Sequence, residues 1–344
     1  MPDKHLFLHI GTHKTGTTSI QSFLQTNRVE MESRGFYYPA DGMYYLSAES
    51  SQSLLAHAVL GRRPAYIGDV EFDLDTCVAD IRRDIGKSSC PNVIVSSEHF
   101  SYASTKDDVR RILDVFTGLV GKITVIIYLR RQHALIESGW SQQIKTGLIT
   151  SSLNEYLEAG RDWDYFQHVE LFASALDREN VIVRPYEVGQ LHKRDVVSDF
   201  LNTIGYKIHR IPGIRINESP PTEMLELMRY FGKSFSIDRE RITFNRILQS
   251  LPIKIDKARY TLFSEQMRSA LIDRYRNSNS RVAQEYLGRA DGVLFFDSEI
   301  SALPVYPGMT IERFSAISAQ VITLLLNTNN QLARKIRDAE SSAH

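Results

Sequence analysis

A glycine-flanked loop near the start of the chain carries residue types that bind phosphate. The stretch 6–24 reads LFLHIGTHKTGTTSIQSFL, in which an apolar run leads into Gly-x-x-x-x-Gly and then into hydroxyl residues. The backbone N–H groups of such a turn, with the positive end of the following helix, form an anion site. In the loop of triphosphatases a lysine directly follows the second glycine. Here Thr17 and Thr18 follow Gly16, and Lys14 lies inside the loop.

This loop is too weak to hold a nucleotide alone. A helix N-terminus contributes about 0.3–1 kcal/mol, or about 2 kcal/mol when partly buried, whereas micromolar binding requires about 8 kcal/mol. Lys14 and the hydroxyls at 17–19 add donors, but a second anchor is still needed. A dinucleotide-binding fingerprint does not fit, because the residue two after Gly11 is His13 rather than glycine.

A second strand end supplies that anchor. KITVIIYLR (122–130) is β-branched and apolar, and it ends in Arg130. An arginine can form two parallel charge-assisted bonds to a phosphate, each contributing about 1.5–3 kcal/mol. Ser138 follows eight residues later in a helical stretch. Arg131 is the alternative ligand if the strand ends one residue later.

A third strand end offers groups for proton transfer. SSEHF (96–100) closes an apolar run and contains Glu98 and His99. A hydroxyl that attacks a phosphate-linked group must lose its proton to a nearby base. His13, inside the loop, could also serve, and His9 is more typical of a structural histidine beside a strand. The sequence leaves the choice among Glu98, His99 and His13 open.

Strands and helices alternate along the first two thirds of the chain and position these residues. Apolar strand patterns cover 5–10, 35–39, 122–130 and 181–186, and the stretch 92–100 begins as a buried strand. Helical periodicity follows the loop and recurs over 107–119, 165–176 and 197–204. Strands that are apolar on both faces and separated by helices indicate a parallel sheet covered on two sides. In such sheets ligands bind beyond the carboxyl ends of the strands. We therefore expect an α/β fold with three layers around a central parallel sheet.

The chain of 344 residues is interpreted as a single domain, 1–344. Its core covers about 5–206 and includes a variable segment, 40–75. A mainly helical region, about 211–326, would form an acceptor pocket or lid. The residues 327–344 form a polar tail.

Composition restricts the partners. Forty-one basic residues balance 41 acidic ones, so no overall field attracts nucleic acid or an anionic membrane. No apolar run approaches the roughly 20 residues of a membrane-spanning helix, and the N-terminal run is too short for a signal peptide. The two cysteines, Cys77 and Cys90, suit a reducing compartment. These features predict a cytoplasmic protein.

The loop and the strand-end arginine together resemble the sulfotransferases. HIGTHKTGTTSIQ (9–21) is similar to their 5′-phosphosulfate-binding loop, especially in bacterial members, and Arg130 with Ser138 is similar to their 3′-phosphate signature. The resemblance covers 5–27 and 92–147, and more loosely 160–206. It implies a P-loop-like fold and the donor 3′-phosphoadenosine-5′-phosphosulfate (PAPS), which leaves as 3′,5′-diphosphoadenosine (PAP) without a metal.

The resemblance also implies roles. In the family the lysine within the loop contacts the departing 5′-phosphate, and a glutamate or histidine ends a strand comparable to 92–98. Tyr186 is similar to a tyrosine near the adenine. The family's Arg-Lys-Gly loop is missing from the last third. The catalytic candidates are Lys14, Glu98, His99 and His13. The expected donor-binding residues are Gly11, Thr12, His13, Lys14, Thr15, Gly16, Thr17, Thr18, Ser19, Arg130, Ser138 and Tyr186.

The sequence therefore predicts a PAPS-dependent sulfotransferase that acts on a hydroxyl, and the resemblance to bacterial members implies a carbohydrate or glycolipid acceptor. Two alternatives remain. An ATP- and magnesium-dependent small-molecule kinase would fit the loop, although Thr17 stands where its lysine belongs. A non-catalytic interaction protein would bind PAP without turnover.

Overall fold

The computed structural model describes residues 3–40, 51–62, 73–160, 162–207, 220–255, 260–296 and 303–342. Two compact units make up the chain, and each is assembled from separated segments. The first comprises Met1–Leu135, Asp162–Ile216 and Ala270–Ser298; the second comprises Ile136–Arg161, Asn217–Ser269 and Glu299–His344. The single domain expected over 1–344 stays a prediction.

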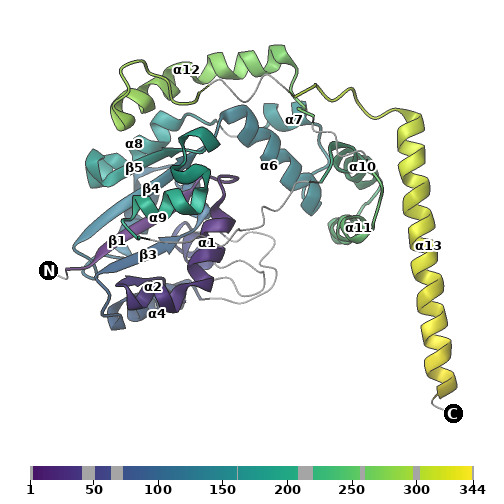
Figure 1. Ribbon diagram of the computed structural model, residues 1–344, viewed down its shortest axis with the longest axis horizontal. Coiled ribbons are helices and arrows are strands. Elements are labelled where there is room, and N and C mark those ends of the chain that lie inside the picture. Colours follow the sequence, from purple (N-terminus) through teal and green to yellow (C-terminus); the bar gives the residue numbers. More distant parts are fainter. Residues whose placement is uncertain are drawn as a thin grey trace. The chain divides into compact units, whose positions relative to one another are not determined.

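A five-stranded parallel sheet lies at the centre of the first unit (Figure 1). Its order is β2-β3-β1-β4-β5, with β1 (His5–Gly11), β2 (Phe36–Tyr37), β3 (Asn92–Ser96), β4 (Lys122–Leu129) and β5 (Val181–Pro185). The chain leaves β1 toward β2 and leaves β4 toward β5, on the opposite side. The topological switch point therefore lies between the carboxyl ends of β1 and β4, where sheets of this kind bind ligands.

Helices cover both faces of this sheet. Successive residues of a strand point to opposite faces, so each strand contributes side chains to two cores. On one face Ile94 packs in a core with Phe200, and on the other face its neighbour Val95 packs in a core with Phe172. The first core includes residues of α1 (Thr17–Thr26), α2 (Arg28–Ser33) and α9 (Val196–Thr203). The second includes residues of α3 (Ser53–Val59), α4 (Leu74–Lys87), α5 (Lys106–Asp114), α8 (Tyr165–Leu176) and α12 (Glu265–Leu287). The predicted three-layer α/β fold is confirmed.

Short 3-10 helices adjoin the strands: η2 (Glu98–Tyr102) follows β3, η3 (Arg178–Asn180) precedes β5, and η4 (Val188–Gln190) and η5 (His192–Arg194) follow β5. β3 ends at Ser96, so Glu98 lies just beyond a strand end, as the sequence predicted. β4 ends at Leu129, one residue before the Arg130 that was expected to end it.

The second unit is helical in its described residues. It contains most of α6 (Gln132–Thr146), together with α7 (Leu153–Glu158), α10 (Thr222–Gly232), α11 (Asp238–Ser250) and α13 (Ile311–Ser342). α13 includes the residues 327–342 of the expected polar tail. Much of the variable segment (41–50 and 63–72) and the residues 208–219 lie outside the described residues. None of the described helices is long and apolar enough to cross a bilayer.

Candidate functional site

The loop between β1 and α1 depends on two glycines and on a lysine in a rare backbone conformation. Gly11, Lys14 and Gly16 have φ values of 75°, 62° and 77°. A Cβ at Gly11 would lie 2.9 Å from Cβ of Glu98, and one at Gly16 would lie 2.8 Å from Cγ1 of Val196, so space as well as φ requires glycine. The left-handed conformation costs a residue such as Lys14 about 1–2 kcal/mol. Backbone strain of this kind clusters at functional sites.

Threonine hydroxyls brace the loop from inside. The amide and the hydroxyl of Thr12 both donate to the carbonyl of Tyr128 on β4, at 2.9 and 3.0 Å. The hydroxyl of Thr15 donates to the Thr12 carbonyl at 2.5 Å, and that of Thr17 points at the same carbonyl from 3.5 Å. These three side chains are buried. The structure thus shows them holding the shape of the loop and its position against β4.

The first turn of α1 presents backbone N–H groups. The amides of Ser19 and Ile20 donate to the carbonyl of Gly16 at 3.0 and 3.2 Å. Within the described part of the chain, no group accepts from the amides of Thr17 and Thr18. The first turn holds no acidic side chain to compete for them. This helix end can therefore receive an anion from outside the chain.

Arg130 lies against the loop. Its Nη1 donates to the carbonyl oxygen of Lys14 at 3.1 Å. Its guanidinium carbon lies 5.9 Å from the ring centroid of Tyr186, within range of a cation–π interaction. The Arg130 carbonyl accepts from the hydroxyl of Tyr165, which fixes the backbone at this point. The structure thus brings Lys14, Arg130 and Tyr186 to the neighbouring ends of β1, β4 and β5.

Arg131 has a different set of contacts. Its Nε donates to Oε1 of Glu187 at 2.8 Å, and its Nη2 donates to the carbonyl of Phe296. The amide of Phe296 in turn donates to Oε2 of Glu187 at 2.8 Å. Arg131 therefore holds two segments of the first unit together. The arginine that contacts the carbonyl of Lys14 in the loop is Arg130.

Ser138 lies on α6 and is half-buried. It belongs to the second unit, whereas Arg130 belongs to the first. Their pairing on one phosphate stays a prediction.

Glu98 opens η2 beyond the end of β3. Its Oε2 accepts from Nε2 of Gln21 at 3.2 Å, and the same amide lies 3.3 Å from the hydroxyl of Ser96. Burial raises the pKa of the Glu98 carboxyl, but the imidazoles of His13 and His99, its own backbone amide and Gln21 lower that pKa by more. The net pKa lies below the usual value, so Glu98 is a carboxylate at neutral pH and can accept a proton.

Three imidazoles gather beside Glu98. The ring centroid of His99 lies 4.4 Å from that of His57 on α3 and 5.6 Å from that of His13 in the loop. The ring centroid of Tyr102 lies 4.9 Å from that of His13. Burial lowers the pKa of His99, and burial together with the His99 ring lowers the pKa of His57 to about 3. His57 and His99 are therefore neutral at pH 7. Among the described residues, no group of three His, Cys, Asp or Glu side chains could hold a metal ion.

His9 is a structural residue. It is fully buried, and its Nδ1 lies 2.8 Å from the hydroxyl of Ser96. Its ring meets that of Tyr128 edge-on at 5.7 Å and lies 5.3 Å from that of Phe200. Burial lowers the pKa of His9 to about 4, so it stays neutral inside the core.

Sequence reasoning missed two residues of this site, Gln21 and His57. Gln21 lies four residues after Thr17, on the same face of α1, so the helical period could have identified it. His57 lies in the segment treated as a variable insertion, and no local pattern in the sequence links it to His99.

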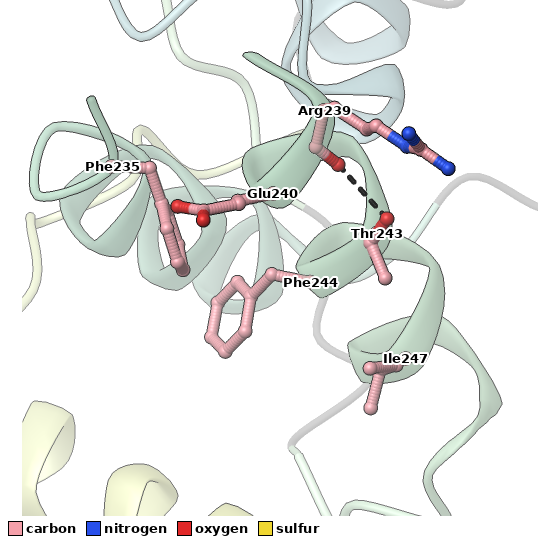
Figure 2. A pocket seen from close by; sticks show the side chains of 6 residues that line it. All are labelled: Phe235, Arg239, Glu240, Thr243, Phe244 and Ile247. Carbon is pink, nitrogen blue, oxygen red and sulfur yellow. Dashed lines mark hydrogen bonds between the residues drawn. The ribbon is translucent and has the colours of Figure 1, made fainter. Parts of the chain in front are cut away.

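A separate hollow of about 370 Å³ lies within the second unit (Figure 2). The rings of Phe235 and Phe244, 5.1 Å apart, line it together with Ile247. Arg239 and Glu240 add one charge of each sign. This lining is mainly apolar and contains none of the predicted site residues.

Comparisons with known proteins give limited matches. No protein-family profile matches the chain. An uncharacterised protein of Archaeoglobus fulgidus is 25% identical over 213 residues, and the match covers 60% of this chain and 57% of that protein's length. A sulfotransferase structure from Alicyclobacillus acidocaldarius has a TM-score of 0.42 at 18% identity, covering 69% of this chain and 94% of that one. Likeness at this level does not establish an activity for the chain.

Proposed function

We propose that the protein is a sulfotransferase that moves a sulfuryl group from PAPS to a hydroxyl, without a metal. The observation that carries this proposal is the contact of 3.1 Å between Nη1 of Arg130 and the carbonyl of Lys14. It means that Lys14, beyond the end of β1, and Arg130, beyond the end of the neighbouring strand β4, meet at the switch point although 116 positions separate them. A ligand with two separate phosphates needs such a pair of anchors.

The α1 end of the site suits a single phosphate. The amides of Thr17 and Thr18 supply donors at the positive end of the helix. The left-handed Lys14 places a cation inside the loop rather than after it. When bound, PAPS would supply a sulfuryl group linked to its 5′-phosphate. Lys14 would stabilise the charge that grows on that phosphate as the link breaks.

The β4 end of the site suits the 3′-phosphate and the adenine of PAPS. Arg130 would bind the 3′-phosphate through its guanidinium, with Ser138 as the proposed partner. Tyr186, beside Arg130, would pack near the adenine.

The β3 end of the site suits the acceptor. The acceptor oxygen forms a bond to sulfur as the bond from sulfur to the 5′-phosphate oxygen breaks, and the acceptor's proton must go to a base. Glu98 is already ionised at neutral pH, and Gln21 orients its Oε2. His99 is neutral and next to it, and His13 lies in the loop itself. We assign the base to Glu98, with His99 or His13 as the other candidates.

The acceptor is proposed to be a carbohydrate or glycolipid hydroxyl. A cytoplasmic location is part of the proposal, because the two cysteines, Cys77 and Cys90, are both free thiols. A screen of labelled PAPS over hydroxyl-bearing glycans would identify the acceptor.

A thermal-unfolding comparison tests the donor. A ligand at 100 times its Kd stabilises the folded state by about 2.7 kcal/mol. We expect PAP without metal to raise the melting temperature by several degrees, and ATP with Mg²⁺ to raise it little. Lys14→Asn should lose this shift, since asparagine tolerates the left-handed backbone but has no charge. Lys106→Ala, at an exposed lysine of α5, is the control.

Two outcomes would contradict the proposal. A larger shift with ATP and Mg²⁺ than with PAP would favour the kinase. An undiminished PAP shift in Lys14→Asn would show that the loop does not bind the nucleotide.

A further inference from the structure

From Ile322 onward α13 carries a pattern of its own. Ile322, Leu325, Asn329, Leu332 and Ile336 recur at alternating spacings of three and four residues. This is the heptad spacing at which one helix presents a continuous seam to a second helix. In heptad letters, isoleucine occupies the outer two a positions, asparagine the central a position, and leucine both d positions.

The two halves of α13 differ in what covers them. In the first half, Ile317 and Val321 are buried, and Phe314 stacks on Phe231 of α10 at 5.5 Å. In the second half, every residue from 325 to 337 is exposed. Packing on α10 therefore explains the buried apolar residues of the first half of α13, but not the apolar residues of the second half.

The seam residues are exposed well beyond what is usual for apolar side chains. Ile322 is 58% exposed, Leu325 37%, Leu332 52% and Ile336 58%. Single exposed leucines are common on protein surfaces. A line of them over four turns of one helix is not, because most of the stability of helices in proteins comes from packing of their apolar face.

We propose that this seam pairs with the same seam of a second copy of the chain, as a parallel two-stranded coiled coil. Isoleucine at a with leucine at d favours two strands, and one asparagine at a fixes register and oligomer state. In a parallel pair a meets a, so Asn329 meets its own copy and the two amides can hydrogen-bond. In an antiparallel pair a meets d, which would set Asn329 against a leucine.

Charge agrees with this pairing. No charged residue occurs between Arg313 and Arg334, so nothing repels a second copy along most of the seam. Beyond it the sequence places Lys335 at a g position and Glu340 at the following e position, which are the positions that face each other across a parallel pair. A second copy therefore matches the surface in shape, register and charge.

This inference does not depend on the proposed activity. Its test is the molar mass of the full-length protein, measured by sedimentation over a range of concentrations. We expect a dimer that dissociates on dilution. Leu332→Asp should weaken association at least 100-fold, whereas Gln331→Asp, its exposed neighbour at a c position, should leave it unchanged.

Two further variants examine the geometry. Asn329→Ile should strengthen association or raise the oligomer above two, because it removes the register-setting amide. Ile336→Cys, with Cys77 changed to serine, should form a disulfide between copies, since identical a residues adjoin only in the parallel pair. A monomer at all concentrations would overturn the proposal. So would equal effects of Leu332→Asp and Gln331→Asp, or an Ile336→Cys variant that does not cross-link.

Discussion

Two halves of the same sheet edge are built from different chemistry. At the β1–β4 edge the groups are Lys14, Arg130 and the amides that start α1, which are cations and hydrogen-bond donors. At the β1–β3 edge the groups are the carboxylate of Glu98 and the imidazoles beside it, which can accept a proton. The first half is suited to binding phosphates, and the second to accepting a proton.

The two halves also differ in how they are held. The loop is fixed by backbone conformation and by hydroxyl-to-carbonyl bonds, such as that of Thr15 to Thr12. Glu98 is held by the side chain of Gln21 on α1, and the ring of the adjacent His99 contacts that of His57 on α3. Substitutions should therefore separate binding, which belongs to the first half, from turnover, which needs both.

The largest effect should come from Lys14. We expect Lys14→Asn to lower turnover by about 10³-fold, because one lost donor to a developing charge costs about 10²–10³ and donor binding weakens as well. The rate of label transfer from PAPS to the screened acceptor would check this. Lys106→Ala should match the wild type, and a comparable loss there would remove Lys14 from the mechanism.

Glu98 should give the cleanest separation. Glu98→Gln removes the base but keeps the size of the side chain, so we expect turnover to fall by about 10²-fold while PAP still raises the melting temperature fully. If turnover persists, the base is His99 or His13, and the corresponding His→Gln variants then locate it. Loss of PAP binding in Glu98→Gln would instead mean that the two halves are not separate.

The adjacent arginines provide a matched pair. Arg130→Gln should weaken PAP binding by about 10- to 100-fold, since a charge-assisted bond contributes about 1.5–3 kcal/mol. Arg131→Gln should leave binding near normal and lower the melting temperature, because it leaves Glu187 without its ion pair. Titration calorimetry with PAP and unfolding in urea measure the two effects. If Arg131→Gln weakened PAP binding and Arg130→Gln only lowered stability, Arg131 would be the phosphate ligand and Arg130 the structural residue.

The smallest expected effect concerns pH. His9 and His57 have pKa values lowered from 6.5 to about 4 and about 3. The unfolded chain therefore binds protons that the folded chain excludes, so stability is full above about pH 6.5 and falls as the pH drops toward 4. The lowered pKa of Glu98 acts in the same direction, but only near and below its ordinary value of 4.5.

Unfolding free energies at pH 7 and pH 5 would measure this loss. His9→Asn should reduce the difference between the two pH values, although the variant is less stable overall. Lys14→Asn should leave the difference unchanged, because it removes neither of the two buried imidazoles. A difference that is the same in wild type and His9→Asn would contradict the assignment of a buried neutral His9.

Much of the first unit could be read from local sequence. Apolar runs such as 122–129 form strands wherever helices cover both faces, and Gly16 ends a loop because only glycine adopts its φ without cost. The position of Glu98 beyond β3 followed from the serines that end the strand. The heptad in α13 is equally present in the sequence, but it lies across the boundary between the expected helical region, which ends at 326, and the expected polar tail, which begins at 327.

Other features required the folded chain. Which arginine faces the loop depends on where β4 ends and on Glu187, which lies more than 50 residues away. The hydroxyls of Thr12, Thr15 and Thr17 turned inward, a direction that residue type does not specify. Local preference and strand periodicity determine elements and their ends, because they act over a few residues. Contacts such as those of Glu98 with Gln21, or of His99 with His57, arise only when the sheet brings distant segments together, so the tertiary structure alone decided them.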